Sequence, residues 1–197
     1  SKADNDDISD LITALLKASR PIINAGQGVL YGEATDELVE FAELTNTPVL
    51  TTLAGKSAFP ENHRLALGTG AHSATLMVDH FLGKADFVLG IGTSFTMSTF
   101  NAPMPKGIVL AHSTNCAEDI NKDYKAHYGA VGDSRLVLRQ MIAEVKKQLG
   151  DNGQKDVDKV SNEISQVRGQ FMKEWGPKLG SNEIPISPYR VIGELIK

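Results

Sequence analysis

RPIINAGQGVLYGEA, residues Arg20–Ala34, joins a short apolar run to a glycine-rich turn and an acidic segment. The letters PIIN predict a buried strand, and the acidic segment opens a predicted helix over residues 33–45. Strand, turn and helix in this order form one unit of an α/β domain. The turn reads Gly26-x-Gly28-x-x-x-Gly32, which is one residue longer than the dinucleotide fingerprint Gly-x-Gly-x-x-Gly. It therefore predicts either a phosphate cradle or a simple reversal of the chain.

The alternation of strands and helices continues along the first 150 residues. Apolar runs predict further strands at residues 49–52, 87–91, 108–111 and, more weakly, 130–131. Apolar residues at helical spacing predict helices at residues 4–17, 73–82 and 134–149. Ser134 is the expected cap of the last helix. Together these elements predict a doubly wound, mostly parallel sheet of five or six strands with helices on both faces.

Composition narrows the class of protein. The chain has 197 residues and 41% hydrophobic residues, which suits a globular domain. Its net charge is -4 and its charges are scattered, which argues against nucleic-acid or membrane partners. One cysteine, Cys116, excludes an internal disulfide and a cysteine zinc site. There is no apolar run of the ~20 residues that a membrane helix needs, and the amino terminus is acidic, unlike a signal peptide. We expect a cytoplasmic protein.

The pattern changes after residue 150. We expect residues 1–150 to form one domain and residues 151–185 to form a polar linker with a charged helix that runs to about Trp175. Residues 186–197 predict the start of another helix, with Ser187 as cap and Pro188 at the first helical position. Because the chain stops inside this helix, we expect it to be part of a longer protein.

Ligands of open parallel sheets bind at the carboxyl ends of the strands, where the loops of this sequence are small and polar. These loops are residues 26–28, 52–56, 90–94 and 112–115, and a fifth, residues 68–72, precedes a predicted helix. Residues 53–72 show little periodicity and predict a long functional loop. The loops could line a nucleotide-sized cleft, or their glycines could serve only short connections. Common catalytic and metal-binding motifs are missing from the sequence, so we predict no catalytic residue and no metal ligand.

Several segments in order resemble the central domain of thiamine-diphosphate-dependent enzymes, in particular the acetolactate synthase and benzoylformate decarboxylase group. The segments are ASRPIINAGQGV, TNTPVLTTLAGKSAFPENHRLALGTGAH, KADFVLGIGTSF and LAHSTNCAEDINKDYKAHYGAVGD, within about residues 8–149. Residues 186–197, ISPYRVIGELIK, resemble the start of the carboxy-terminal, diphosphate-binding domain of these enzymes. The resemblance implies a Rossmann-like, non-catalytic domain of a 2-oxo acid decarboxylase or carboligase. The whole enzyme would then be a transferase or a lyase.

The resemblance also implies where cofactors bind. In the whole enzymes, thiamine diphosphate and Mg²⁺ lie between an amino-terminal and a carboxy-terminal domain, so this fragment is not expected to bind them or to be active alone. The family's central domain can hold FAD or an adenine nucleotide. Carried over by position, the residues along the flavin's path are Gly26, Gln27, Gly28, Thr52, Leu53, Ala54, Gly70, Ala71, His72, Gly92, Thr93 and Ser94.

The sequence departs from the flavin-binding members of the family. Ser94 and Asn115 stand where those members carry an arginine and acidic residues. An arginine would neutralise phosphate through charge-assisted hydrogen bonds, so its loss is expected to weaken FAD binding. An empty cleft therefore remains an expectation beside FAD and ADP.

The expected partners are the missing domains of the same chain and further copies of it, as a dimer or tetramer. Two readings from other classes stay open. One is a stand-alone flavin- or nucleotide-binding module, like an electron-transfer flavoprotein or a sirtuin, although a single cysteine cannot build the sirtuin zinc site. The other is a purely structural assembly domain.

Overall fold

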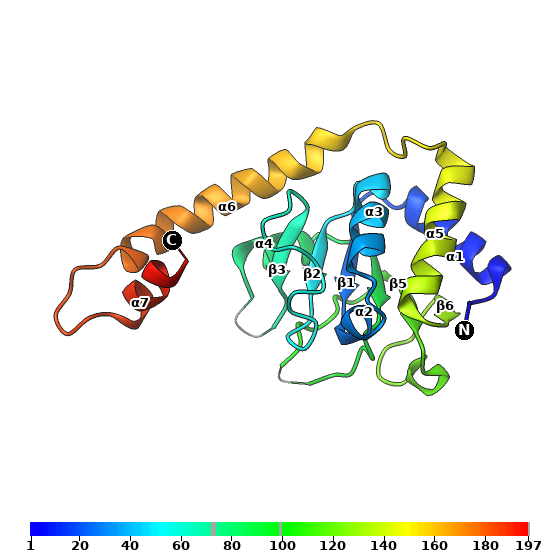
Figure 1. The fold of residues 1–197 in the computed structure, drawn as a ribbon, viewed down its shortest axis with the longest axis horizontal. Helices are drawn as coiled ribbons and strands as arrows, with labels where there is room; N and C mark the ends of the chain where they lie inside the picture. The colour runs from blue at the N-terminus through cyan, green and yellow to red at the C-terminus, as the bar shows by residue number, and fades with distance from the viewer. Residues whose placement is uncertain (72–73, 99, 197) are drawn as a thin grey trace.

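A parallel β-sheet forms the centre of the molecule. The computed structural model describes residues 1–71, 74–98 and 100–196. Within them, six strands pair in the order β3-β2-β1-β4-β5-β6, and every pair is parallel (Figure 1). The strands are β1 (Pro21–Ala25), β2 (Val49–Thr51), β3 (Ala66–Thr69), β4 (Phe87–Ile91), β5 (Val109–Thr114) and β6 (Tyr128–Val131). The predicted doubly wound α/β class is confirmed.

The order of the strands creates a switch point at the middle of the sheet. From β1 the chain builds outward through β2 to β3, then returns to β4 on the other side of β1 and continues to β6. At the carboxyl ends, Ala25 of β1 pairs with Ile91 of β4. Ligands of such sheets bind in the crevice beyond this point, because the loops on its two sides diverge.

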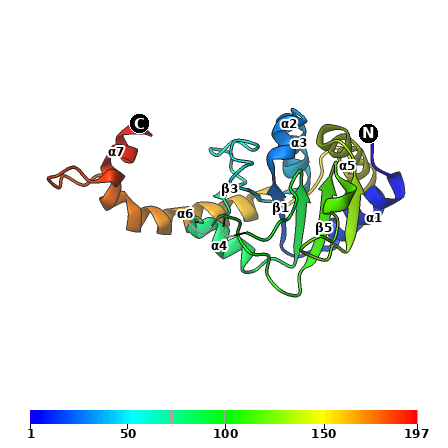
Figure 2. The ribbon, with the colours of Figure 1, turned by 90° about the horizontal axis from the view of Figure 1, so that it is seen from below.

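Helices cover both faces of the sheet. One face packs against α1 (Asn5–Lys17), α3 (Thr35–Thr45) and α5 (Ser134–Leu149), and the short α2 (Gln27–Tyr31) joins them through Val29. The other face packs against α4 (Leu76–Leu82) and α6 (Val157–Leu179) (Figure 2). Alternate residues of β1 divide between the two cores, since Ile23 faces the first and Ile22 the second. This two-sided burial explains the continuous apolar runs in the strands.

A hydrogen-bonded cluster of charged side chains attaches α6 to the sheet. Glu163 of α6 accepts hydrogen bonds from Arg20 (Nη2 to Oε1, 2.8 Å) and from His80 of α4 (Nε2 to Oε1, 2.8 Å). Beside this cluster, Ile164 and Val167 are buried in the second core. The first half of α6 is therefore docked by apolar and ionic contacts together.

The second half of α6 extends away from the sheet and carries α7 (Pro188–Leu195) at its far end (Figures 1 and 2). The ring of Trp175 meets the edge of Tyr189, with centroids 5.4 Å apart. Ser187 and Pro188 occupy the N-cap and first helical positions of α7, as predicted, although no hydrogen bond from the Ser187 side chain caps the helix. No helix in the described ranges is long and apolar enough to cross a membrane.

Two segments that contain glycines form regular elements that the sequence does not predict. The sequence predicts residues 53–72 as a loop, but β3 forms at its end, where Gly68 has a positive φ and the pairing with β2 shifts register. The predicted turn over residues 26–32 contains α2. Glycine argues against regular structure in both segments, and tertiary contacts override that preference.

The boundaries of α4 and α6 and the cap of α5 also differ from prediction. Helix α4 begins at Leu76 after the N-cap Thr75, while the predicted start at Ser73 lies outside the described residues. The cap of α5 is Asp133, not Ser134, because the Asp133 carboxylate accepts the backbone N–H groups that follow it. Helix α6 continues past Trp175 to Leu179 and includes Pro177.

Candidate functional site: a cleft at the switch point

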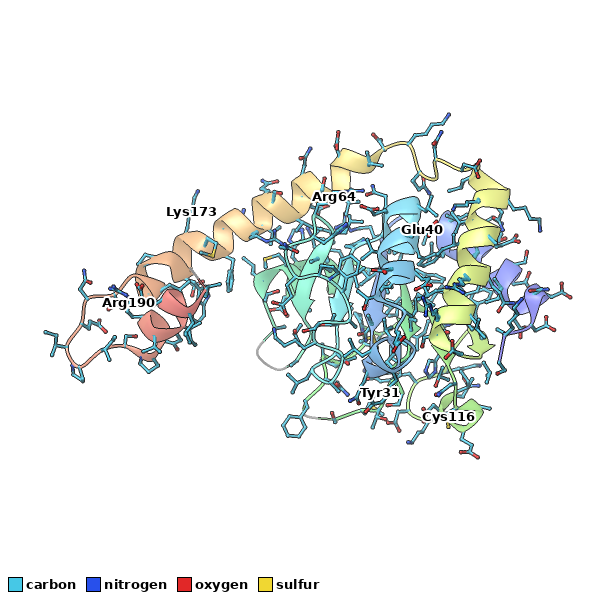
Figure 3. All side chains as sticks on the ribbon, viewed as in Figure 1. Tyr31, Glu40, Arg64, Cys116, Lys173 and Arg190 are labelled. Carbon is cyan, nitrogen blue, oxygen red and sulfur yellow. The ribbon has the colours of Figure 1, made fainter. Side chains whose placement is uncertain are left out.

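A cleft of about 400 Å³ opens at the carboxyl ends of β1, β4 and β5. Tyr31, one of its lining residues, and Cys116, which follows the lining residue Asn115, lie toward this end of the sheet (Figure 3). A volume of this size suits one small organic ligand. The lining residues are Gly26, Gln27, Gly28, Tyr31, Gly32, Thr52, Ala54, Gly92, Thr93, Ser94, Asn101, Thr114, Asn115, Asp119, Asp133 and Ser134.

The glycines of the cleft are needed where the turns after β1 and β4 touch. A Cβ on Gly28 would lie 2.7 Å from the Cα of Gly92, and a Cβ on Gly92 would lie 2.7 Å from the backbone N of Val29. Gly92 also has φ +60°, a conformation that L side chains rarely adopt. A Cβ on Gly26 would overlap the carbonyl of Gly92. These glycines therefore let two backbones meet, and this contact forms the floor of the cleft.

Some of the backbone donors that could bind a phosphate are already used in these turns. The N–H of Gly26 donates to the carbonyl of Ile91 and the N–H of Gly28 donates to the carbonyl of Gly92, both at 2.8 Å. At the start of α5, the Oδ1 atom of Asp133 accepts the N–H groups of Arg135 and Leu136, both at 3.1 Å. Phosphate sites of α/β proteins use N–H groups at such glycine turns and helix starts.

Charge near the cleft is also negative. Among the described residues that line it, Asp119 and Asp133 are acidic and none is lysine or arginine. Arg135 is the neighbouring cation on α5, but its Nε donates to Oε1 of Glu37 at 2.8 Å. Burial would raise the pKa of Glu37, yet hydrogen bonds from Arg135 and Arg139 hold it below its usual value. The Arg135 guanidinium is thus committed to a stable ion pair with α3.

His112 positions the loop after β4 instead of facing a ligand. Its side chain is buried, and Nε2 donates to the carbonyl of Thr93 at 2.7 Å. The Phe95 ring packs against the imidazole with centroids 4.9 Å apart. Burial lowers the pKa of His112, against the opposing effects of the Thr93 carbonyl and Asp119, so the imidazole is neutral at physiological pH. The contacts of His112 therefore hold the loop that carries Thr93 and Ser94 in place.

The structure brings most of the predicted binding residues to one place. Those that line the cleft are Gly26, Gln27, Gly28, Thr52, Ala54, Gly92, Thr93 and Ser94. Leu53, Gly70 and Ala71 are not among its lining residues; the Gly70 N–H donates to the carbonyl of Thr51 at 2.8 Å. His72 lies outside the described residues. The role of the whole set in binding stays a prediction.

Sequence reasoning did not single out Tyr31, Asn101 and Asp119, which also line the cleft. Tyr31 ends the short helix α2, Asn101 lies in the segment between β4 and β5, and Asp119 lies in the 3₁₀ turn η1 (Ala117–Asp119). The sequence contains a positional signal for two of them, because Tyr31 lies in the glycine turn after the first strand and Asp119 follows the end of a later strand. The approach of Asn101 depends on how the segment between β4 and β5 folds.

A known protein family matches this chain. The family model described as "Thiamine pyrophosphate enzyme, central domain" matches residues 8–141. The chain belongs to this family. The assignment confirms the resemblance that the ordered loops predicted. Thiamine diphosphate is accordingly the cofactor that characterises the family, whereas FAD and Mg²⁺ are not established for this chain by the match.

Several relatives of this central domain are acetolactate synthases. A probable acetolactate synthase large subunit of Methanococcus aeolicus is 31% identical over 96% of this chain, and the match covers 32% of that protein. An acetolactate synthase of Mycobacterium avium is 32% identical over 82% of this chain and 26% of that protein. The chain thus spans about a third or less of the length of these relatives.

A solved structure supports the fold. The crystal structure of benzoylformate decarboxylase from Polynucleobacter necessarius superposes with a TM-score of 0.64 at 21% identity. The match covers 81% of this chain and 29% of that chain. At this level of identity the likeness shows that the central domain shares the fold.

Proposed function

We propose that this chain is the non-catalytic central domain of a longer, cytoplasmic thiamine-diphosphate-dependent enzyme, acetolactate synthase-like, that decarboxylates or joins 2-oxo acids. The observation that carries the proposal is the family match over residues 8–141 together with relatives about three times as long. In this proposal residues 1–150 are the domain, residues 151–185 connect it to the next one, and residues 186–197 begin that domain. The longer enzyme assembles as a homo-oligomer.

The cofactor chemistry of the parent enzyme belongs to its other domains in this proposal. Thiamine diphosphate supplies the carbanion-stabilising centre for such reactions. In residues 1–71, 74–98 and 100–196, no group of three or more His, Cys, Asp or Glu side chains is placed to hold a metal ion. We assign no metal ligand and no catalytic step to the residues of this domain.

The contribution of this domain is a rigid sheet and the cleft at its switch point. We propose that the cleft binds a nucleoside-containing ligand, because its polar lining and its place beyond β1 and β4 match the binding region of doubly wound sheets. The predicted residues Gln27, Thr52, Thr93 and Ser94 would contact that ligand.

The proposal is tested by assaying the purified 197-residue chain beside a full-length acetolactate synthase. With pyruvate, thiamine diphosphate and Mg²⁺, we expect CO₂ release from the synthase and none above background from the chain. Isothermal titration of thiamine diphosphate with Mg²⁺ into the chain should likewise give no binding heat. Saturable CO₂ release by the chain alone would show that it holds a complete catalytic site and would refute the proposal.

A further inference from the structure

We infer that the cleft accepts an uncharged, hydroxyl-bearing ligand of the nucleoside class and discriminates against a diphosphate. The inference deepens the proposed function and rests on it, because it concerns what the same cleft binds. FAD and adenine nucleotides are the ligands that the family resemblance implies. The residues of this cleft do not fit the diphosphate of these ligands, because of the hydrogen bonds and the charges on the cleft wall.

The first reason is that the chain itself already uses several of the donors that a diphosphate would need. A diphosphate needs several donors, and the N–H groups of Gly26 and Gly28 end on the carbonyls of Ile91 and Gly92. At the start of α5, the N–H groups of Arg135 and Leu136 end on the carboxylate of Asp133. Freeing either set would break hydrogen bonds and, at α5, would remove a helix cap.

The second reason is the sign of the charge. A diphosphate in the cleft would share it with Asp119 and Asp133, with no lysine or arginine among the described lining residues. Lys122, which does not line the cleft, is a nearby cation, with its Nζ 3.8 Å from Oδ1 of Asp119. Like charges at this range repel, and a cleft with low-dielectric walls strengthens the effect.

The same carboxylates suit the hydroxyl groups of a sugar. An ionised carboxylate is a pure acceptor and commonly binds ribose hydroxyls in doubly wound folds. Both helix-capping bonds of Asp133 end on Oδ1, so Oδ2 is the atom that would accept from a ligand hydroxyl. Thr93, Ser94 and Asn115 line the same cleft, and their side-chain hydroxyl and amide groups can donate and accept.

Adenosine and ADP are the probes that test the inference, because they differ only in the diphosphate. Isothermal titration into the full chain at low ionic strength should give a dissociation constant for adenosine at least ~10-fold lower than for ADP. In the double variant Asp119→Asn, Asp133→Asn the two constants should agree within ~3-fold, since asparagine keeps the helix cap but removes the charge. Circular dichroism checks that the variant is folded.

A second double variant controls for net charge. Asp10 and Asp151 are exposed and lie outside the cleft lining, so Asp10→Asn, Asp151→Asn should leave the preference for adenosine unchanged. Binding of ADP to the unmodified chain as tightly as adenosine would overturn the inference and leave the cleft as a ligand site. Binding of neither probe would overturn both the inference and the proposed cleft function.

Discussion

Gly92→Ala is expected to lower the free energy of unfolding by ~2–5 kcal/mol, from the left-handed backbone of an L residue and from the overpacking of a tight contact. The φ of Gly92 is +60°, and the new Cβ would stand 2.7–2.8 Å from the backbone of Gly28 and Val29. Flexible side chains cannot absorb the clash, because the neighbouring atoms are backbone. The contact between the turns after β1 and β4 would have to open.

Urea-induced unfolding followed by far-ultraviolet circular dichroism measures this loss. Gly169→Ala is the matched control, because Gly169 is exposed in α6 and a Cβ there meets nothing within 4 Å. The control should be neutral or gain up to ~1 kcal/mol from helix propensity. Equal stability of the Gly92→Ala variant and the unmodified chain would show that the two turns are not in the contact described.

Glu163→Gln is expected to destabilise the docking of α6 by ~1.5–3 kcal/mol at neutral pH, the range for hydrogen bonds to charged groups. The hydrogen bond from Arg20 lowers the pKa of Glu163 to about 2, against the opposing effect of burial and with a further contribution from His80. Because the folded-state pKa is depressed, the stabilisation is complete above the unfolded pKa of 4.5 and is lost as pH falls toward about 2.

The pH dependence separates this ion cluster from simple packing. The difference in free energy of unfolding between the unmodified chain and the Glu163→Gln variant should be constant near neutral pH and shrink as pH falls below 4.5. Glu174→Gln is the control, since its carboxylate is largely exposed on the distal part of α6, where it pairs with Lys178. A difference for Glu163→Gln that stays the same down to the acid limit would contradict the electrostatic account.

The sequence predicts the sheet well because its strands are buried on both faces. Continuous apolar runs such as those around Ile23 and Leu89 can lie only between two helix layers, and that constraint leaves little choice of fold. β3 is the exception. It is an edge strand with Gly68 at positive φ, so its pairing depends on β2 more than on its own residues.

The cleft is predictable in place but not in chemistry. Glycines and small polar residues after the strands point to its walls, and most of the predicted residues line it. A sequence cannot show that the N–H of Gly28 already ends on the carbonyl of Gly92, or that Asp133 caps α5 in place of Ser134. Those tertiary hydrogen bonds determine which ligands the cleft can bind.

Amide hydrogen exchange measured by nuclear magnetic resonance tests this central claim most directly. The account predicts that the Gly26 and Gly28 amides exchange as slowly as those of the central strands, because they donate at 2.8 Å across the floor of the cleft. Adding ADP should leave their exchange rates unchanged, because these N–H groups do not bind its diphosphate. Fast exchange of these amides in the free protein, with large shifts and new protection when ADP is added, would show that the turns are open phosphate-binding sites and would contradict the account.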